Sequence, residues 1–465
     1  MQLGDILDDL TLDLATSILE IDQVDIDSRL CVPGSLFFAL PGTTTSGAQY
    51  ANDAVAHGAV CVIASERIAV DVPVVIVPAS QLRALSAHAS ATIVRNPELK
   101  AELVGVTGTN GKTTVTTLVG ALARALLWNG ANIGTLTSER TTPAGPELFR
   151  QLAGLVESFN PALKKSVIAL EVSSHAIDQG RIEGLGFKVV AFTNLGHDHL
   201  DYHSTMEAYF AAKSHLFTAE FAQRAVIWVD DPYGVRLAAS TALPVTEVAR
   251  ADASEIVTSL TGTTFFWRGH LINSTLVGDF NVDNSLIAMT ILSVLGADDW
   301  AIASAMGNVA SVPGRFDVLQ GHGVTVVVDY AHTPEGLRRL LVDVRDMVPG
   351  GRVITVFGCG GDRDRAKRPE MGAIATSLSD VTIVTSDNPR SESPDAIIDA
   401  IMLGVPPSAT IIRQSDRRLA IAQAVATAAP GDVVVIAGKG HESKQIIGDV
   451  TLPFDDRVIA AGVLR

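Results

Sequence analysis

The sequence is poor in cysteine, lacks long apolar runs and carries few basic residues relative to acidic ones. Its three cysteines show neither paired spacing nor a CxxC motif, which favours a reduced compartment over a disulfide framework (Cys31, Cys61 and Cys359). No apolar run approaches the ~20 residues that span a bilayer. Residues 1–10 are acidic and do not have the profile of a signal peptide. We therefore expect a cytoplasmic protein without membrane insertion.

The charge balance narrows the range of partners. With 35 basic and 51 acidic side chains, the formal net charge is −16, whereas nucleic-acid binding needs a basic surface. We therefore expect no nucleic-acid partner. An anionic small molecule is compatible with this charge, because single loops of an acidic protein can be basic.

Length and apolar pattern together predict three α/β domains. At roughly 150 residues per domain, a chain of 465 residues is expected to form about three, and we place them at residues 1–98, 99–314 and 315–465. Uninterrupted apolar runs are typical of parallel strands that are buried on both faces. Such runs occupy residues 36–40, 59–63, 74–77, 103–107, 167–170, 189–192, 226–229, 324–328, 353–357, 381–385 and 433–437.

Polar clusters follow most of these strands. In open α/β sheets, ligands bind outside the carboxyl ends of the strands, so seven clusters in these positions indicate an enzyme. We expect two α/β sheets that face a shared cleft. The clusters are GTNGKTT, EVSSH, TNLGHDH, DYAHTP, FGCGGDRD, SDNPRSE and AGKGHE.

The first cluster is typical of a phosphate-binding loop. It stands between a predicted strand and a predicted amphipathic helix, where glycines let backbone N–H groups surround phosphates and Lys112 adds a charge. Thr113 is placed to ligate Mg²⁺. The pattern GxxxxGK[ST] is not met, because its first glycine would fall on Val106. The alternative is a glycine-rich helix cap, and a phosphate loop alone does not name a reaction.

Two further residues have an unusual setting. Lys213 shares a helix face with apolar neighbours such as Tyr209 and Leu216, where loss of hydration lowers the pKa of an amine. Such an amine can be nucleophilic and can add CO₂. Periodicity alone leaves open a lysine whose stem lies on the apolar face and whose amine reaches water. Glu171 ends a predicted strand, where it can hold Mg²⁺ or cap the following turn.

The order of these motifs resembles the Mur ligase family over nearly the whole chain. The motifs that carry the resemblance include GTNGKTT (108–114), EVSSHAIDQGRI (171–182), TNLGHDHLDYH (193–203), YFAAKSHLF (209–217), GDFNVDN (278–284), GRF (314–316), DYAHTP (329–334), GCGGDRDRAKRP (358–369), DNPRSESP (387–394) and GKGHE (438–442). Residues 27–42 are similar to the family's UDP-binding domain. The resemblance implies a small N-terminal domain that binds a UDP-linked precursor, a central P-loop ATPase-like domain and a C-terminal Rossmann-like domain.

The resemblance also implies ATP and two Mg²⁺ ions as cofactors. By this resemblance the catalytic residues are Lys112, His199 and Lys213, and Lys213 is carbamylated. The implied metal ligands are Thr113, Glu171, His199 and Lys213. The implied ATP contacts are Gly108, Thr109, Asn110, Gly111, Lys112, Thr113, Thr114, Asn281, Asn284, Arg315 and Asp329. For the last four, helix capping and a surface ion pair are the alternatives.

The family members that add the third residue of the cell-wall peptide match best. The resemblance then implies UDP-MurNAc-dipeptide as a substrate, bound by Ser28, Thr141, Thr142, Ser173, Gln179 and Arg181. The chain departs from the family at residues 43–45 (Thr-Thr-Thr) and 138–140 (Ser-Glu-Arg), which leaves the contacts there open. We expect a monomer.

The DNPR segment predicts the amino acid that is added. The guanidinium of Arg390 can hold a carboxylate with two hydrogen bonds, and relatives with this form add meso-diaminopimelate. The implied contacts are Arg363, Asp387, Asn388, Pro389, Arg390, Gly438 and Glu442, with Glu442 suited to an ammonium group. The alternative for Arg390 is a surface arginine in a proline turn.

The expected reaction is phosphorylation of the D-glutamate γ-carboxylate by ATP, followed by attack of the diaminopimelate amine on the acyl phosphate. The same reaction with L-lysine or another diamino acid stays an alternative. So do a folate-polyglutamating ligase, a non-catalytic scaffold and a phosphate-loop switch or motor. Arg390 argues against a lysine acceptor. The DNPR segment and the EVSSHA and DHLDYH pair argue against a folate ligase. Lys112, Glu171, His199 and Lys213 argue against a scaffold, and the C-terminal amino-acid-binding motifs argue against a switch or motor.

Overall fold

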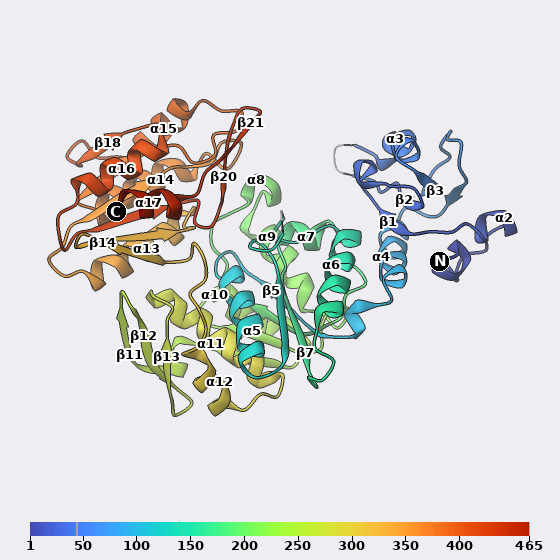
Figure 1. Ribbon diagram of the computed structural model, residues 1–465, viewed down its shortest axis with the longest axis horizontal. Coiled ribbons are helices and arrows are strands. Elements are labelled where there is room, and N and C mark those ends of the chain that lie inside the picture. The colour runs from blue at the N-terminus through green and yellow to red at the C-terminus, as the bar shows by residue number, and fades with distance from the viewer. Residues whose placement is uncertain (43–44, 139, 465) are drawn as a thin grey trace.

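A computed structural model describes residues 1–42, 45–138 and 140–464. Its ribbon separates into three α/β units along the chain (Figure 1), which confirms the predicted three-domain architecture. The N-terminal unit lies to one side and joins the middle unit through α4 (Leu82–Ile93), while the C-terminal unit lies above the middle one. Among the described residues, no helix combines the length and apolar character needed to cross a membrane.

The N-terminal unit is built on a four-stranded parallel sheet in the order β1-β2-β3-β4. Apolar side chains cover both of its faces, as expected for parallel strands. Arg150 ties this unit to the middle one, because its Nη1 donates to the carbonyl of Val24 (2.8 Å) and to Asp25 Oδ1 (3.2 Å). The elements are α1 Leu3–Ile6, α2 Leu14–Ser17, β1 Gln23–Asp25, β2 Ser35–Phe38, α3 Ala51–Ala56, β3 Ala59–Ala64, β4 Val74–Ile76 and α4.

The middle unit contains a six-stranded parallel sheet in the order β10-β9-β8-β5-β7-β6. A three-stranded antiparallel sheet, β11-β12-β13, packs beside it. The strands are β5 Glu102–Thr107, β6 Asn129–Ile133, β7 Ser166–Glu171, β8 Phe187–Phe192, β9 Ala225–Trp228, β10 Val245–Val248, β11 Ala253–Ser259, β12 Gly262–Trp267 and β13 His270–Ser274. The helices are α5 Lys112–Ala125, α6 Gly145–Ser158, α7 Ser174–Asp178, α8 Leu200–His203, α9 Met206–Ser214, α10 Pro232–Ser240, α11 Asp279–Val294 and α12 Asp299–Met306.

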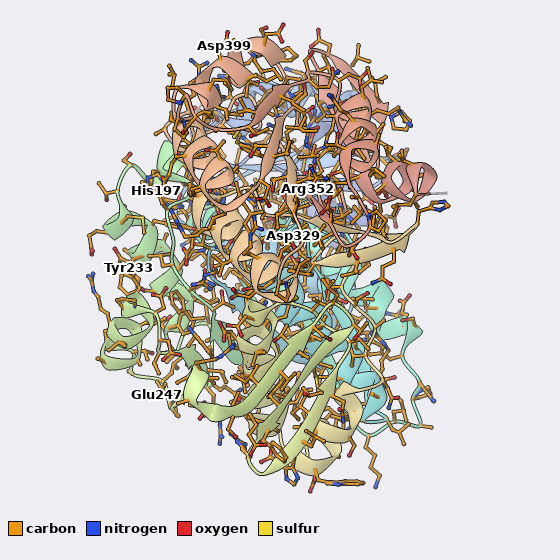
Figure 2. All side chains as sticks on the ribbon, turned by 90° about the vertical axis from the view of Figure 1, so that its left-hand side faces the viewer. His197, Tyr233, Glu247, Asp329, Arg352 and Asp399 are labelled. Atoms are coloured by element: carbon orange, nitrogen blue, oxygen red, sulfur yellow. The ribbon has the colours of Figure 1, made fainter. Side chains whose placement is uncertain are left out.

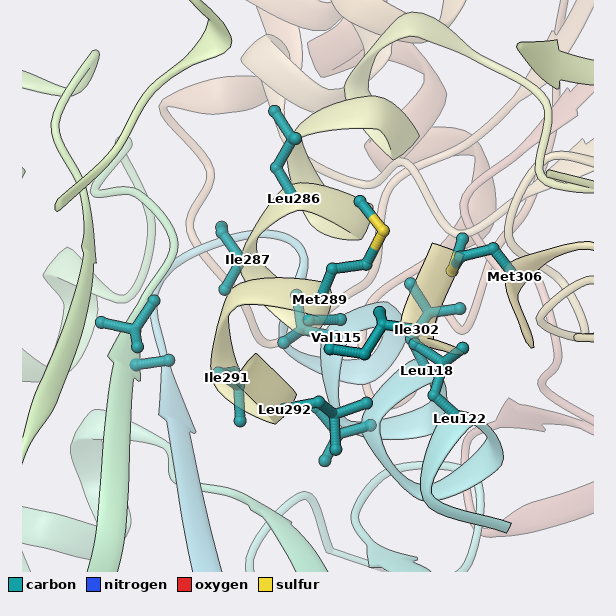
Figure 3. Close-up of a cluster of buried hydrophobic side chains, with 14 of the residues drawn as sticks. Val115, Leu118, Leu122, Leu286, Ile287, Met289, Ile291, Leu292, Ile302 and Met306 are labelled. Atoms are coloured by element: carbon teal, nitrogen blue, oxygen red, sulfur yellow. The ribbon is translucent and has the colours of Figure 1, made fainter. Parts of the chain in front are cut away.

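A dry core joins α5 to α11 and α12. Figure 3 shows Val115, Leu118 and Leu122 of α5 packed among apolar side chains of the two later helices, and all are fully buried. Both α5 and α11 begin at polar motifs, GKTT and GDFNVDN. The apolar core therefore sets the distance between the phosphate loop and the asparagines of α11.

The C-terminal unit has a six-stranded sheet in the order β14-β15-β19-β16-β17-β18, parallel except for the antiparallel edge strand β14. A hairpin, β20–β21, follows the last central strand. The strands are β14 Asp317–Gly321, β15 Val324–Asp329, β16 Val353–Phe357, β17 Val381–Val384, β18 Ile411–Arg413, β19 Val433–Ala437, β20 Lys444–Ile447 and β21 Val450–Pro453. The helices are α13 Pro334–Met347, α14 Lys367–Leu378, α15 Pro394–Met402, α16 Arg417–Thr427 and α17 Asp456–Val463.

Each predicted apolar run lies on an observed strand, with ends that differ by at most two residues. The strands without such a prediction are shorter, alternating or at sheet edges. The segment of β6, NGANI, has few apolar residues, and its burial alternates along the strand. The strands β11 to β13 are exposed on one face, so they lack the uninterrupted apolar signal.

A buried ion pair holds the ends of two central strands of the C-terminal sheet. Arg417 has a fully buried side chain and donates to both carboxylate oxygens of Asp456, at 2.8 and 2.7 Å. Its other N–H groups donate to the carbonyls of Ser386 (3.3 Å) and Ala437 (3.0 Å). These carbonyls immediately precede the DNPR and GKGHE motifs, so Arg417 positions both loops.

Replacing Arg417 by methionine is expected to destabilise the C-terminal unit by about 3–5 kcal/mol, because Asp456 would be left as a buried charge without a partner. Chemical denaturation, followed by a probe in that unit, measures the change. Arg413→Met removes a surface pair with Asp399 and is expected to cost about 0–1 kcal/mol. Equal losses in the two variants would contradict the role given to Arg417.

Candidate active site

The phosphate loop has the geometry that its sequence predicts. Gly108 and Gly111 have φ values of +149° and +86°, which L side chains rarely adopt. A Cβ atom at Gly108 would collide with Thr193, and one at Gly111 would collide with Asn284. The loop ends where α5 begins, so the positive end of a long helix faces it. The missing first glycine of the standard pattern therefore does not prevent a phosphate-loop conformation.

Two lysines converge on one carbonyl of this loop. The oxygen of Gly108 accepts from Lys112 Nζ (2.8 Å) and from Lys213 Nζ (2.9 Å). The side chain of Lys213 is only 1% exposed and lies over the ring of Tyr209, with Nζ 4.6 Å from its centroid. Burial, and then the charge of Lys112, hold the pKa of Lys213 well below its ordinary value. The apolar face predicted from periodicity is confirmed, and the reading with an amine in water is wrong.

Glu171 lies at the end of β7 beside the start of α5. It is buried, and its carboxylate accepts from Thr113 Oγ1 (3.0 Å) and from the backbone N–H of Thr135 (2.8 Å). Arg315 of the C-terminal unit also reaches Thr113, with 3.0 Å from Nη2 to Oγ1. The structure thus brings Thr113 and Glu171 together as oxygen donors of the kind that Mg²⁺ prefers. Among the described residues, no group of three His, Cys, Asp or Glu side chains could hold a metal by itself.

The loop after β8 connects the phosphate loop to the C-terminal unit. Gly196 N–H donates to Thr109 Oγ1 (2.9 Å). His199 Nε2 lies 3.5 Å from Asp198 Oδ2, and His332 of the C-terminal unit lies 3.9 Å from the same oxygen. Burial opposes ionisation of Asp198, yet the charges of His199, His332 and Lys367 bring its pKa to about 2. Burial lowers the pKa of His199 to about 4, so its imidazole is neutral and can act as a metal ligand at neutral pH.

A cavity of about 550 Å³ opens between the middle and C-terminal units. Its lining includes Gly111, Asn284, Arg315 and Asp329, which the sequence assigns to nucleotide binding. Asp329, labelled in Figure 2, lies near the level where the two units meet. The predicted shared cleft between the two sheets is therefore confirmed. Asn281 does not line the cavity; it donates to the carbonyl of Val277 (2.7 Å) and accepts from Asn284 Nδ2 (3.1 Å).

The residues predicted for precursor binding form one hydrogen-bonded group, apart from Ser28. Thr142 Oγ1 donates to the carbonyl of Glu171 (2.8 Å) and accepts from the Ser173 N–H (3.1 Å). Arg181 donates to the carbonyl of Thr142 (3.0 Å) and to Gln179 Oε1 (2.6 Å). Thr141 meets this group through the hydroxyl of Thr135 (3.3 Å). Ser28 is buried in the N-terminal unit. Of the departures from the family pattern, residues 43, 44 and 139 lie outside the described residues.

Three loops of the C-terminal sheet meet at its carboxyl edge, after β16, β17 and β19. Asn388 Nδ2 donates to Glu442 Oε2 (2.8 Å), and both side chains contact Lys439 Nζ, at 3.0 and 2.9 Å. Asp387 lies against Gly438, since a Cβ there would be 2.7 Å from Asp387 Oδ2. The structure thus brings together four of the predicted amino-acid contacts, Asp387, Asn388, Gly438 and Glu442, and adds Lys439.

Arg390 projects from the same edge in a strained conformation. Its φ is +52°, and its Nη1 donates to the carbonyl of Gly361 (2.7 Å). The loops are braced by Glu392, which accepts from Arg368 (2.8 Å) and from the N–H of Asp362 (2.7 Å). Hydrogen bonds from Arg368, and its charge with that of Arg365, bring the pKa of Glu392 to about 2. Arg363 is exposed, and its Nη1 donates to the carbonyl of Asp362 (3.4 Å).

Family models cover most of the chain in three consecutive segments. They are the "Mur ligase family, catalytic domain" at residues 20–106, the "Mur ligase middle domain" at 106–292 and the "Mur ligase, glutamate ligase domain" at 314–440. A Gloeobacter violaceus protein named UDP-N-acetylmuramoyl-L-alanyl-D-glutamate--2,6-diaminopimelate ligase is 44% identical over 94% of this chain and 93% of its own length. The chain belongs to the Mur ligase family.

Other relatives extend the comparison. A Geobacillus kaustophilus protein of the same name is 40% identical over 96% of this chain and 95% of its own length. A solved structure of a ligase with this name matches all of this chain and 98% of its own, with 30% identity and a TM-score of 0.68. The ADP complex of MurF from Thermotoga maritima, at 19% identity and a TM-score of 0.62 over 89% and 93% of the two chains, shares the fold. The prediction of a Mur ligase fold and family is confirmed.

Sequence reasoning missed several residues of this Mur ligase site. Asp198 and His332 lie on loops that the sequence singled out, but their meeting depends on the placement of two separate units. Lys439 lies inside the GKGHE motif, but the sequence does not predict its burial, because a lysine between two glycines has no apolar pattern around it. Arg417 lies on a helix outside every motif.

Asp343 is a further missed residue, on α13 of the C-terminal unit. Its Oδ2 accepts from the N–H of Asp279 (2.6 Å) and thereby caps α11, the helix of the middle unit that carries Asn281 and Asn284. Burial, together with the charge of Asp279, raises the pKa of Asp343 to about 7. One wall of the cavity, at the start of α11, thus depends on a cap that comes from the C-terminal unit.

Asp343→Asn is expected to raise the melting temperature more at pH 8.5 than at pH 6. A carboxyl whose pKa is raised in the folded protein binds a proton more tightly there than in the unfolded chain, so the wild type loses stability as the pH rises towards 7. The amide oxygen keeps the cap without this loss. Melting curves of both proteins at the two pH values test this, and an equal difference at both would contradict the assignment.

Proposed function

We propose that the protein joins meso-diaminopimelate to the D-glutamate γ-carboxylate of UDP-MurNAc-L-Ala-D-Glu, using ATP. One observation carries the proposal. The phosphate loop lies at the edge of one sheet. A group suited to a zwitterion, Arg390 with Asn388 and Glu442, lies at the edge of another sheet. The loops at both edges converge on the junction of the middle and C-terminal units. The names of the relatives specify the same reaction.

ATP occupies the cavity between the middle and C-terminal units. Its phosphates lie at residues 108–114, where the N–H groups at the start of α5 and Lys112 neutralise their charge. Asn284, Arg315 and Asp329 line the same cavity. Asn284 would contact the adenine, and Arg315 and Asp329 would contact the ribose and phosphates. Asn281 acts indirectly, because its amide positions Asn284.

Magnesium fits the donors that surround the phosphate loop. Thr113 Oγ1 and the buried carboxylate of Glu171 are 3.0 Å apart and are hard oxygen ligands. They would hold one ion, and His199 with a carbamate on Lys213 would hold a second. When bound, the ions offset the negative charge that builds up on the phosphoryl group.

Lys213 has the setting that carbamylation requires. Its amine is buried, close to Lys112 and low in pKa, so the neutral form that attacks CO₂ is accessible. The nitrogen lone pair bonds to the carbon of CO₂ and the nitrogen loses a proton, which leaves an anion. The product places an anion, in place of an amine, beside Lys112 at the Gly108 carbonyl.

The peptide bond then forms in two steps. The D-glutamate γ-carboxylate attacks the terminal phosphorus of ATP, ADP leaves, and an acyl phosphate remains. The neutral amine of diaminopimelate attacks the acyl carbon, and phosphate leaves from the tetrahedral intermediate. The protein's contribution is to bind, orient and offset charge: Arg181 and the Thr142 group hold the precursor, Arg390 and Glu442 hold the acceptor, and Lys112 stabilises the phosphates.

Other features of the proposal follow the chemistry of the substrates. The domains are residues 1–98 for the precursor, 99–314 for ATP and 315–465 for the amino acid. The protein acts as a monomer in the cytoplasm, where ATP is available and where three cysteines stay reduced. All three are buried and unpaired, which is consistent with that compartment.

Phosphate release is expected with the UDP-muramoyl dipeptide and meso-diaminopimelate, and not with L-lysine. Arg390→Ala is expected to lower kcat/KM for diaminopimelate roughly 10- to 100-fold, the loss of a charge-assisted pair worth about 1.5–3 kcal/mol. A coupled phosphate assay with both acceptors measures this. The exposed Arg338→Ala on α13 is the matched control.

Release with L-lysine alone would keep the ligase and overturn the acceptor. No release with either acceptor, in protein shown to be folded, would overturn the proposed reaction.

Lys213→Met is expected to lower turnover at least about 100-fold, because it removes an anionic metal ligand. In the wild type, removal of dissolved CO₂ lowers turnover and bicarbonate restores it. Carbon-13 NMR after exposure to labelled bicarbonate is expected to show a carbamate in the wild type and in the exposed control Lys164→Met. Turnover that does not depend on CO₂, with no carbamate signal, would show that Lys213 acts as an amine.

A further inference from the structure

Lys439 is a buried cation that the proposed reaction does not use. Its side chain is 0% exposed. The flanking residues Gly438 and Gly440 have φ values of +117° and +53°. A Cβ atom at Gly440 would lie 2.8 Å from Tyr330 Cβ, so the backbone is packed too closely for another residue. This close packing directs Lys439 into the protein, beneath the loops that hold the acceptor.

The ammonium group of Lys439 makes two hydrogen bonds, both to predicted acceptor contacts. It donates to Asn388 Oδ1 (3.0 Å) and to Glu442 Oε2 (2.9 Å). Asn388 Oδ1 also accepts from the N–H of Ile446 (3.0 Å). With two donors at its oxygen, the amide of Asn388 cannot flip, and its Nδ2 is held against Glu442 Oε2 (2.8 Å).

These contacts change what Glu442 offers to a substrate. Its Oε2 is already taken by Lys439 and Asn388, and its Oε1 is the oxygen left for an incoming ammonium group. The charge of Lys439 offsets that of the Glu442 carboxylate at hydrogen-bond distance, 2.9 Å from Nζ to Oε2. The ammonium group of an acceptor therefore meets a Lys439–Glu442 pair that is nearly neutral. Its electrostatic attraction to Glu442 is weaker than it would be to an unpaired carboxylate.

On this basis we propose that Lys439 is a specificity-determining residue that makes an ammonium group insufficient for acceptor binding. The inference rests on the proposed function. Because Glu442 is partly neutralised, the distal end of the acceptor gains most of its binding from the carboxylate held by Arg390. Meso-diaminopimelate has this carboxylate and L-lysine does not. Lys439 thus disfavours L-lysine, because the terminal ammonium group of L-lysine meets no unpaired carboxylate at Glu442.

The first test compares acceptors in Lys439→Met. The ratio of kcat/KM for meso-diaminopimelate to that for L-lysine is expected to fall at least about ten-fold, chiefly because kcat/KM for L-lysine rises. The KM for ATP is expected to change less than about two-fold. The control is Lys444→Met, an exposed lysine on the adjoining strand β20, for which the ratio is expected to stay within about two-fold. A purely structural role would lower both kcat/KM values equally, and an unchanged ratio would overturn the proposal.

A double variant tests the same point through Glu442. Lys439→Met with Glu442→Gln removes both charges, so no unpaired carboxylate is left in the site. The gain in L-lysine use seen with Lys439→Met is expected to disappear. If the gain persists, it does not come from the freed charge of Glu442, and the proposal is wrong.

The third test uses the wild-type protein and is independent of folding in any variant. Two competitive inhibitors of diaminopimelate addition are compared: 2-aminopimelate, which lacks only the distal ammonium group, and L-lysine, which lacks only the distal carboxylate. 2-Aminopimelate is expected to bind at least about ten-fold more tightly. Equal or tighter binding of L-lysine would overturn the role of Lys439.

These outcomes separate the inference from the proposed function. A wild-type protein without turnover of diaminopimelate refutes the proposed reaction. Turnover of diaminopimelate together with an unchanged acceptor ratio refutes the role of Lys439 alone.

Discussion

The carbonyl oxygen of Gly108 accepts hydrogen bonds from two lysine side chains, and much of the site depends on this arrangement. Two ammonium groups at one oxygen repel each other, and burial adds to the cost of charging Lys213. The fold keeps both amines there: Lys112 comes from the start of α5, and Lys213 is held by the buried face of α9 against Tyr209. Loss of a proton from Lys213 relieves this repulsion, and so does nearby negative charge; phosphates and a carbamate are the anions that the proposed reaction provides.

The site is assembled from the ends of strands in separate units. Parallel strands place their carboxyl ends at one edge, and the middle and C-terminal sheets turn these edges towards a common cavity. Polar contacts across the gap include Arg315 to Thr113, His332 to Asp198, and the cap that Asp343 provides for α11. Apolar contacts add to them, because Val277 and Phe280 of the middle unit pack against the core of the C-terminal unit.

The acceptor site uses charge in a different way. At the phosphate loop, lysine side chains are placed to bind an anionic substrate. Near Glu442, by contrast, the cation of Lys439 is already paired with a carboxylate of the protein. The buried pair of Arg417 and Asp456 lies directly beneath and sets the spacing of the DNPR and GKGHE loops. In the C-terminal unit, the pair of Arg417 and Asp456 thus positions the two loops, and the pair of Lys439 and Glu442 underlies the proposed selectivity.

The sequence by itself determined the three-unit α/β organisation, the strands and the loops that carry chemistry. Uninterrupted apolar runs have few alternatives to buried parallel strands, and each observed run lies on one. It could also indicate that Lys213 lies on an apolar face, since that depends on helical periodicity alone. Short, alternating or edge strands such as β6 and β11 to β13 could not be predicted, because they lack an uninterrupted apolar run. Only the tertiary structure decided that Lys439 is buried against Asn388 and Glu442, that Asn281 supports Asn284 from outside the cavity, and that Asp198 meets His332. These contacts join residues far apart in the chain, and their geometry depends on how whole sheets and domains pack, which no local pattern encodes.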